Sequence, residues 1–174
     1  KKGYLFDIYL KSTGYFLGGE RDYRKLDLSF SSFYLITKKF ILATRFKVGR
    51  LWSWDQLDID YSYEKFYLGG SSNMRGWEIL KYKTKDGSSS TPVGGIYRFL
   101  NNIEFRIQLN ESLGINIFYD GGILSDNYQN FIKSQIGWNT GVGLTISTPL
   151  GPVRLDYAIP FLNDNIKIEN GKIN

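Results

Sequence analysis

Apolar and polar side chains alternate with a period of two along most of this chain, and this pattern constrains its fold more than any other feature. In residues 96–109, apolar side chains occupy most alternate positions, and Arg98, Glu104 and Arg106 lie between them. Successive side chains of a β-strand point to opposite faces of a sheet, so the pattern predicts a strand with one apolar and one charged face. The same pattern predicts seven strands, at residues 3–11, 24–36, 40–50, 96–109, 114–124, 135–148 and 152–160.

The second face of several predicted strands carries full charges. These are Asp7, Asp27, Arg45, Lys47, Arg98, Glu104, Arg106, Arg154 and Asp156. A soluble β-sandwich would leave this face in water, whereas a membrane β-barrel would place the apolar face in lipid and the charged face in its lumen. The alternation alone leaves both folds open. The aromatic content of 17%, with Tyr and Trp near the strand ends, favours a barrel with aromatic girdles.

Short and long connections alternate between the predicted strands. Residues 37–39 and 150–151 form tight connections, whereas residues 52–95 and 125–134 are long. Outer-membrane barrels show the same alternation, because their periplasmic turns are short and their external loops are long. We therefore expect a single partial barrel domain over residues 1–174, all-β and antiparallel, with residues 52–95 as a long extracellular loop.

The composition argues against an enzyme. The chain has no Cys and no His, which removes the thiol nucleophile and the commonest general base and metal ligand. We expect no catalytic residues, no cofactor and no metal, and we interpret Asp55, Asp58 and Asp60 as solvated loop residues rather than Ca²⁺ ligands. The net charge of +5 is scattered along the strands, which suits anionic lipid or lipopolysaccharide better than nucleic acid.

A motif in the long loop resembles a known family. The stretch Glu64–Trp77 contains Phe66, Gly69-Gly70 and then Arg75-Gly76-Trp77. It resembles the sixth extracellular loop of the outer-membrane protein-assembly and translocation superfamily that contains BamA and TamA. In that loop an aromatic–x–Gly-Gly stretch precedes Arg-Gly-aromatic.

Three further motifs follow in the order of that superfamily. Gly94-Gly95 precedes a strand with Asn102–Arg106, and the next strand carries Phe118–Gly122. The last motif resembles the penultimate hairpin and spans Gly141–Leu144 and Thr148–Ala158, with Pro149, Gly151, Pro152 and Asp156. The four motifs extend over about two thirds of the chain, and their order makes the resemblance specific.

The resemblance implies a role for the long loop. In the superfamily this loop folds into the lumen, where its Arg pairs with carboxylates on nearby strands. Carried over, Arg75 would pair with Glu104 and Asp120, and with Gly76 and Trp77 these residues form what we call the loop lock. The residue pattern agrees independently, because both carboxylates lie on polar strand faces. The alternative is a solvated Arg75, with Glu104 paired to Arg98 or Arg106.

The chain also departs from the superfamily pattern. This sequence does not include the periplasmic repeat domains that usually precede the strands, the predicted strands are fewer than usual, and the pattern of residues 163–174 does not predict the expected last strand. We therefore expect the C-terminal part of a larger barrel, less its last strand.

The resemblance implies a non-enzymatic protein of the bacterial outer membrane that assembles, inserts or translocates other proteins without nucleotide hydrolysis. Unfolded barrel or secreted proteins would be its clients, and periplasmic or lipoprotein subunits its accessories. The alternatives are a two-partner secretion exporter, the barrel anchor of a fused lipase, and a passive porin-like barrel.

Overall fold

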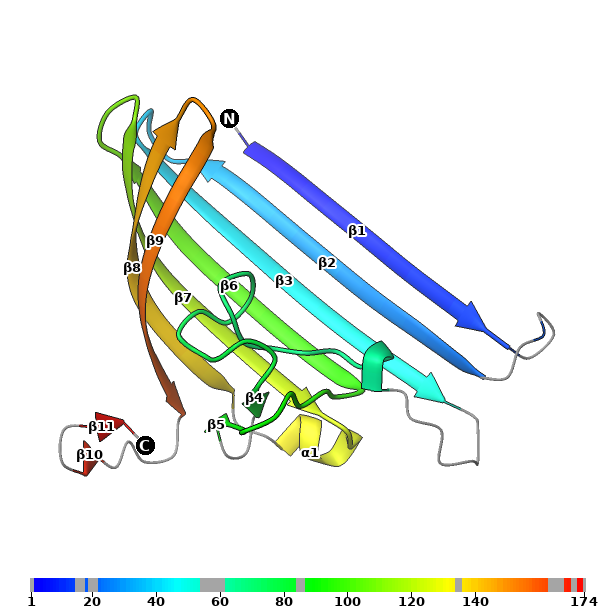
Figure 1. Ribbon diagram of the computed structural model, residues 1–174. Helices are drawn as coiled ribbons and strands as arrows, with labels where there is room; N and C mark the ends of the chain where they lie inside the picture. Colours follow the sequence, from blue (N-terminus) through cyan, green and yellow to red (C-terminus); the bar gives the residue numbers. More distant parts are fainter. Residues whose placement is uncertain are drawn as a thin grey trace.

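The computed structural model contains one antiparallel sheet of seven long strands (Figure 1). The strand order is β1-β2-β3-β6-β7-β8-β9, so the long strands pair in the order of the sequence, and the small strands β4 and β5, which lie between β3 and β6 in the sequence, form a separate two-stranded sheet. The bounds are β1 Lys2–Thr13, β2 Tyr23–Leu35, β3 Phe40–Ser53, β6 Tyr97–Gln108, β7 Leu113–Ser125, β8 Gly137–Thr148 and β9 Gly151–Leu162. The structure describes residues 2–14, 18, 22–53, 62–83, 87–133, 136–162, 168–169 and 172–173.

All seven predicted strands are confirmed, and only their ends differ. Strand β3 continues to Ser53, because its last residues pair with the start of β2, where Tyr23 lies opposite Ser53. The prediction that Pro160 marks a strand end is wrong, since β9 runs on to Leu162. Strand β9 is an edge strand of the described sheet, and proline is tolerated there because its missing N–H breaks no ladder bond.

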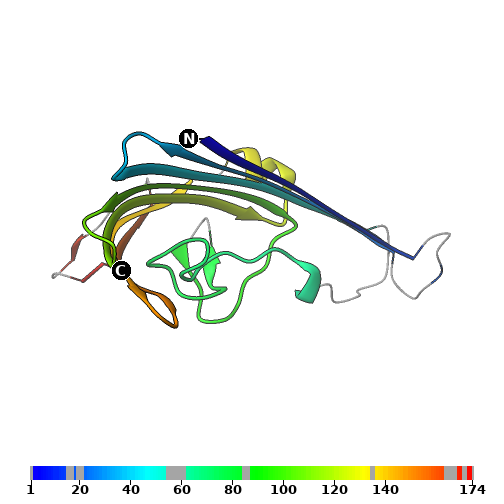
Figure 2. The same ribbon diagram turned by 90° about the horizontal axis from the view of Figure 1, so that it is seen from above.

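The sheet is curved and has two chemically different faces. Figure 2 shows the segment 62–96 against the concave face. The convex face carries exposed apolar side chains, among them Tyr4, Phe6, Ile8, Phe46, Val48, Ile117, Val142, Leu155 and Tyr157. The predicted charged positions lie on the concave face. The sheet is not closed, with β1 and β9 at its edges, so the all-β partial barrel predicted from the alternation is confirmed.

Short connections gather at one end of the sheet and long ones at the other (Figure 1). Residues 36–39, 109–112 and 149–150 make the short turns, and residues 14–22, 54–96 and 126–136 make the long connections. The long connections hold the small elements η2 Ser62–Glu64, β4 Tyr82–Lys83, β5 Gly87–Ser88 and α1 Tyr128–Lys133, and the chain's last part holds β10 Ile168–Glu169 and β11 Lys172–Ile173. Among the described residues, no helix is long and apolar enough to span a bilayer.

Helix α1 was not predicted from the sequence. Its six residues are too few for a periodic pattern, and side chains outside the helix define it. The side-chain oxygen of Asn127 accepts a hydrogen bond from the Gln129 backbone N–H at 2.8 Å, as an N-cap residue does. The rings of Tyr128 and Phe131 pack on Tyr97 of β6. Tertiary contact therefore holds a helix that would be marginal alone.

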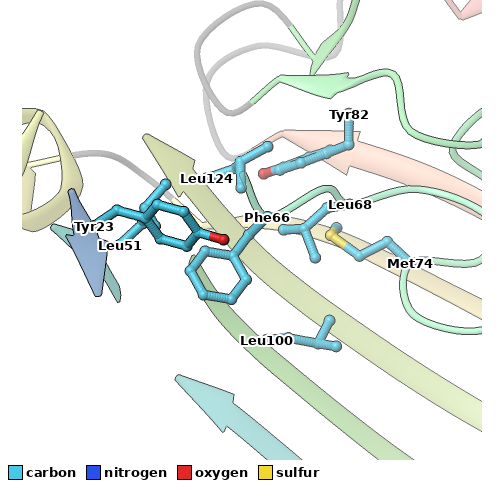
Figure 3. Close-up of a cluster of buried hydrophobic side chains, with 8 residues drawn as sticks. All are labelled: Tyr23, Leu51, Phe66, Leu68, Met74, Tyr82, Leu100 and Leu124. Atoms are coloured by element: carbon cyan, nitrogen blue, oxygen red, sulfur yellow. The ribbon is translucent and has the colours of Figure 1, made fainter. Parts of the chain in front are cut away.

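A compact apolar cluster fixes the long loop to the concave face (Figure 3). The loop contributes Phe66, Leu68, Met74 and Tyr82, and the strands contribute Tyr23, Leu51, Leu100 and Leu124. Burial of one such side chain stabilises by roughly 1.5–3 kcal/mol. The loop is therefore a packed part of the fold.

Candidate functional site

The guanidinium of Arg75 lies in contact with a carboxylate of strand β7. Its Nε donates to Oδ2 of Asp120 at 2.8 Å, and its Nη2 donates to Oδ1 at 2.6 Å. The backbone N–H of Arg75 donates to the same carboxylate at 3.3 Å. Arg75 is 7% exposed and Asp120 is fully buried. This is a bidentate pair in a site removed from solvent, where its hydrogen bonds are stronger than at a surface.

A second carboxylate, Glu104 of β6, accepts hydrogen bonds from three arginines. Arg75 Nη1 lies 2.7 Å from Glu104 Oε2, Arg106 Nε lies 2.7 Å from Oε1, and Arg154 Nη2 lies 2.7 Å from Oε2. Arg154 also donates to Asp156 on its own strand β9. Strands β6 and β9 and the loop therefore meet at Glu104. The local Glu104–Arg106 pair weighed from the sequence is present beside the contact with Arg75, whereas Arg98 pairs with Asp27 of β2.

The charges of this cluster balance. Arg75, Arg106 and Arg154 stand against Glu104, Asp120 and Asp156, three positive and three negative. Arg75, Glu104 and Asp120 are buried, and a buried charge is costly unless it is paired, so the pairing is what allows these three groups to leave water. Both Glu104 and Asp120 are occupied by arginine donors, which leaves neither free to act as a general acid or base.

Three neighbours of Arg75 were not expected from the sequence. Its guanidinium carbon lies 3.5 Å from the ring centroid of Phe118, which is buried on the concave face. Asn102 Nδ2 donates to Asp120 at 2.7 Å and to the backbone oxygen of Asn73 at 2.6 Å. Arg45 of β3 donates to Asn102 and, at 2.5 Å, to the backbone oxygen of Ser72.

The alternation of polar and apolar residues predicts that these side chains lie on the same face of the sheet. It does not predict that they surround the guanidinium of Arg75. That grouping depends on the strand register, in which Asn102 lies opposite both Arg45 and Asp120.

Glycines on the strands let the loop lie close to the wall. A Cβ on Gly49 would come within 2.5 Å of the Phe66 ring, and one on Gly122 would come within 2.4 Å of the Met74 sulfur. Phe66 also bridges to Gly95 by paired backbone hydrogen bonds of 2.9 Å. Only glycine leaves room for these contacts without displacing the loop.

The loop motif itself is tightly turned. Gly69, Gly70 and Gly76 have φ values of 106°, 95° and 84°, a region that glycine adopts without strain. A Cβ on Gly76 would lie 3.0 Å from the Cβ of Ala158, so this glycine approaches strand β9 closely. Trp77 packs edge-on against Tyr82, with ring centroids 5.0 Å apart. The turn thus carries Arg75 to Asp120 while Trp77 joins the apolar cluster.

The residues singled out in the penultimate hairpin divide into two groups. Pro149 lies in the turn between β8 and β9, and Gly151 and Pro152 begin β9, with Gly151 at φ 130°. Asp156 lies further along β9, and its Oδ2 is 3.9 Å from Nη1 of Arg75. Only Asp156 of these four therefore joins the Arg75 cluster. Asp55, Asp58 and Asp60 lie outside the described residues.

A separate ion cluster anchors the start of the loop. Glu64 accepts a hydrogen bond from Lys11 Nζ at 2.6 Å and another from the Tyr23 hydroxyl at 2.9 Å. Lys25 Nζ donates to the Glu64 backbone oxygen at 2.6 Å. Partial burial favours the neutral acid, but the hydrogen bonds from Lys11 and Tyr23 outweigh it and hold the pKa of Glu64 below its usual range. The sequence gave no spacing signal for this contact, which joins residues 53 positions apart.

The match to known families decides what kind of barrel this is. The Omp85 superfamily domain matches residues 1–173. The chain belongs to the Omp85 superfamily. The chain is accordingly an integral protein of the bacterial outer membrane.

A curated Omp85 relative is the outer membrane protein assembly factor BamA of Nitratidesulfovibrio vulgaris. It is 25% identical over 162 residues, which are 91% of this chain and 20% of the relative. The crystal structure of BamA from Haemophilus ducreyi lacking POTRA domains 1–3 has the same fold. The TM-score is 0.74 at 19% identity, over 91% of this chain and 35% of that one. The chain thus spans about a fifth of the curated relative's length.

Proposed function

We propose that this chain is the C-terminal barrel portion of an outer-membrane protein that assembles, inserts or translocates other proteins without nucleotide hydrolysis. The observation that carries the proposal is the bidentate contact of Arg75 with Asp120, joined to Glu104. This loop lock would hold residues 52–95, the extracellular loop, inside the barrel. Gly76 and Trp77 complete it by the close turn and the packing on Tyr82.

The packed loop supports assembly over passive conduction. A porin keeps a water-filled lumen, whereas apolar loop side chains here pack against part of the concave face, at Tyr23, Leu51, Leu100 and Leu124. Arg75 contacts Glu104 of β6, Asp120 of β7 and Asp156 of β9. A loop that braces these three strands would keep the wall rigid near its edge while the rest of the barrel changes shape. The clients would be unfolded barrel proteins or secreted proteins, and periplasmic or lipoprotein subunits would deliver them.

The proposed activity needs no nucleotide and no catalytic group. Client folding and local distortion of the membrane would supply the free energy. The carboxylates that a hydrolase would use, Glu104 and Asp120, are held by arginines. The curated relative is named as an assembly factor, which supports assembly over secretion within the superfamily.

Reconstitution of the full-length protein tests this function. The protein is placed in liposomes without nucleotide, an unfolded barrel client is added, and protease-resistant client is followed over time. We expect faster client folding than in empty liposomes, and loss of most of this gain in Arg75→Gln. Lys39→Gln, at the opposite end of the sheet, serves as the matched control. A steady ion conductance with no gain in client folding would instead indicate a passive barrel.

A further inference from the structure

The lipid-facing surface of the barrel carries one charged side chain set between aromatic rings. Arg50 is exposed near the end of β3, on the convex face. Its guanidinium carbon lies 4.6 Å from the ring centroid of Trp52 and 5.3 Å from that of Tyr97. Among the residues that the structure describes, no carboxylate pairs with Arg50. This sets it apart from the arginines of the concave face, all of which contact acceptors.

Arg50 lies at the boundary of the apolar band. The outward positions before it on β3 are Phe40, Leu42, Thr44, Phe46 and Val48, so Arg50 is the first outward charge towards the long loops. On the neighbouring strands, Trp52 lies opposite Arg24 of β2 and Arg50 lies opposite Tyr97 of β6, so the two rings flank the Arg50 position. Aromatic side chains gather where the hydrocarbon meets the headgroups, and arginine reaches from there to polar groups.

Helix α1 adds to this surface. Figure 2 shows α1, in yellow, on the opposite side of the sheet from the segment 62–96, and therefore on the convex side. Tyr128 and Phe131 lie 5.8 and 5.6 Å from the ring of Tyr97, which ties the helix to the ring beside Arg50. Ile132 and Lys133 are exposed at its end. A short helix with an aromatic face, an exposed apolar residue and a lysine suits the interfacial plane of a membrane.

We propose that Arg50, with Trp52, Tyr97 and helix α1, forms a binding site for the phosphate headgroup of an anionic lipid. The lipid lies in the leaflet on the long-loop side of the barrel. A planar guanidinium can donate two parallel hydrogen bonds to phosphate oxygens, and the two rings beside Arg50 restrict its movement. At the boundary between hydrocarbon and headgroups, a guanidinium without a carboxylate partner reaches the polar headgroups, where a lipid phosphate supplies the opposite charge. The acyl chains of the same lipid would cover the apolar outward positions of β3.

This site is independent of the loop lock. Arg50 points away from the concave face, and its strand neighbours Gly49 and Leu51 point towards the loop. Loss of lipid binding would therefore leave the Arg75 cluster intact, and loss of the loop lock would leave the lipid site intact.

Native mass spectrometry of the full-length protein with diphosphorylated lipid A tests the proposal. The wild type is compared with Arg50→Gln, Arg50→Lys and the control Lys39→Gln. We expect an apparent affinity about tenfold lower in Arg50→Gln, because a charge-assisted hydrogen bond is lost. Arg50→Lys keeps the charge without the planar donors and should bind with intermediate affinity, and Lys39→Gln should bind like the wild type. A shift in electrophoretic mobility on heating checks that each barrel is folded.

Equal binding of lipid A by the wild type and Arg50→Gln would overturn the site. If Arg50→Gln fails to fold, Tyr97→Leu is used in its place. This change keeps an apolar side chain on the outward surface but removes one of the two rings beside Arg50, and we expect it also to lower the affinity for lipid A. A parallel titration uses inorganic phosphate in place of lipid. If free phosphate displaced lipid A at comparable concentration, the site would take a soluble anion and the assignment to a lipid would be wrong.

Discussion

The guanidinium of Arg75 and the carboxylate of Asp120 meet edge to edge, with paired contacts of 2.8 and 2.6 Å across 45 positions of sequence. Two parallel hydrogen bonds fix the orientation of the loop as well as its distance from β7. Asp120 is fully buried, so any movement of Arg75 leaves a carboxylate short of a partner in a site shielded from solvent. The docked loop is therefore expected to be sharply preferred over partly open arrangements.

Replacement of Arg75 by lysine should loosen the loop without removing the charge. Lysine is a point charge that cannot satisfy Asp120 and Glu104 in the same fork geometry. Loss of a partner from a buried ion pair costs about 3–5 kcal/mol, and the lysine variant should show part of that effect. The buried Leu68 gives a reporter when replaced by cysteine, because this chain has no other cysteine. We expect faster thiol labelling at position 68 in Arg75→Lys; equal labelling would show that the apolar cluster alone holds the loop.

The ring of Phe118 should contribute separately from the carboxylates. Arg75 lies over this ring at 3.5 Å in a buried setting, where a cation–π contact contributes about 2 kcal/mol. Phe118→Leu keeps most of the apolar volume and removes the π face. We expect a lower urea midpoint for the barrel in detergent, with a much smaller change when Arg75 is already glutamine. Identical effects in both backgrounds would mean that the ring acts only by packing.

The fold was predictable from the sequence because alternate side chains of a barrel strand face the lipid and the lumen. The side chains that face lipid are apolar, and those that face the lumen are polar or charged. Strands such as β6 and β7 carry that alternation over their whole length, so their positions and faces were predictable. The carboxylates expected to meet Arg75, Glu104 and Asp120, lie in hydrogen-bond contact with it in the structure.

The remaining partners depend on three-dimensional arrangement that alternation does not encode. Arg154 reaches Glu104 only because β9 curves back towards the loop, and its distance of 50 positions carries no sequence signal. The fixing of α1 by Tyr97 and the anchoring of Glu64 by Lys11 are likewise contacts between distant segments. Arg75 was predicted only from the resemblance of the loop motif to the superfamily. Periodicity could not identify it, since a single arginine in a long loop shows no repeating pattern.

Gly49 should be required for docking of Phe66. A methyl group at position 49 would lie 2.5 Å from the ring, which must then move away from the wall. We expect Gly49→Ala to lower the thermal midpoint of the folded barrel and to raise labelling at position 68. The matched control is Gly3→Ala, where an added Cβ meets nothing within 4 Å. The double variant Gly49→Ala with Phe66→Leu has a smaller side chain at the clash site and should recover part of the lost thermal midpoint. If the midpoint does not recover, the alanine destabilises strand β3 directly and not through Phe66.

The contact of Glu64 should weaken in acid. Its pKa in the folded state is lowered from 4.5, so the carboxylate stabilises the fold fully above that value. The contribution is lost as pH falls through the folded pKa, because the protonated acid no longer pairs with Lys11. We expect the thermal midpoint of the wild type to fall more than that of Glu64→Gln over this range. Parallel curves for the two proteins would show that Glu64 does not contribute to the acid sensitivity.

The charge-reversal series Arg75→Glu, Asp120→Arg and the double variant tests the central claim most directly. Each is introduced into the full-length protein in cells depleted of the native copy, and folded outer-membrane barrels are quantified. The loop-lock account predicts that both single reversals lower these levels and that the double reversal restores them in part, since Glu104 would still repel a glutamate at position 75. Levels like the wild type in all three variants would contradict the account and favour a passive or anchoring barrel.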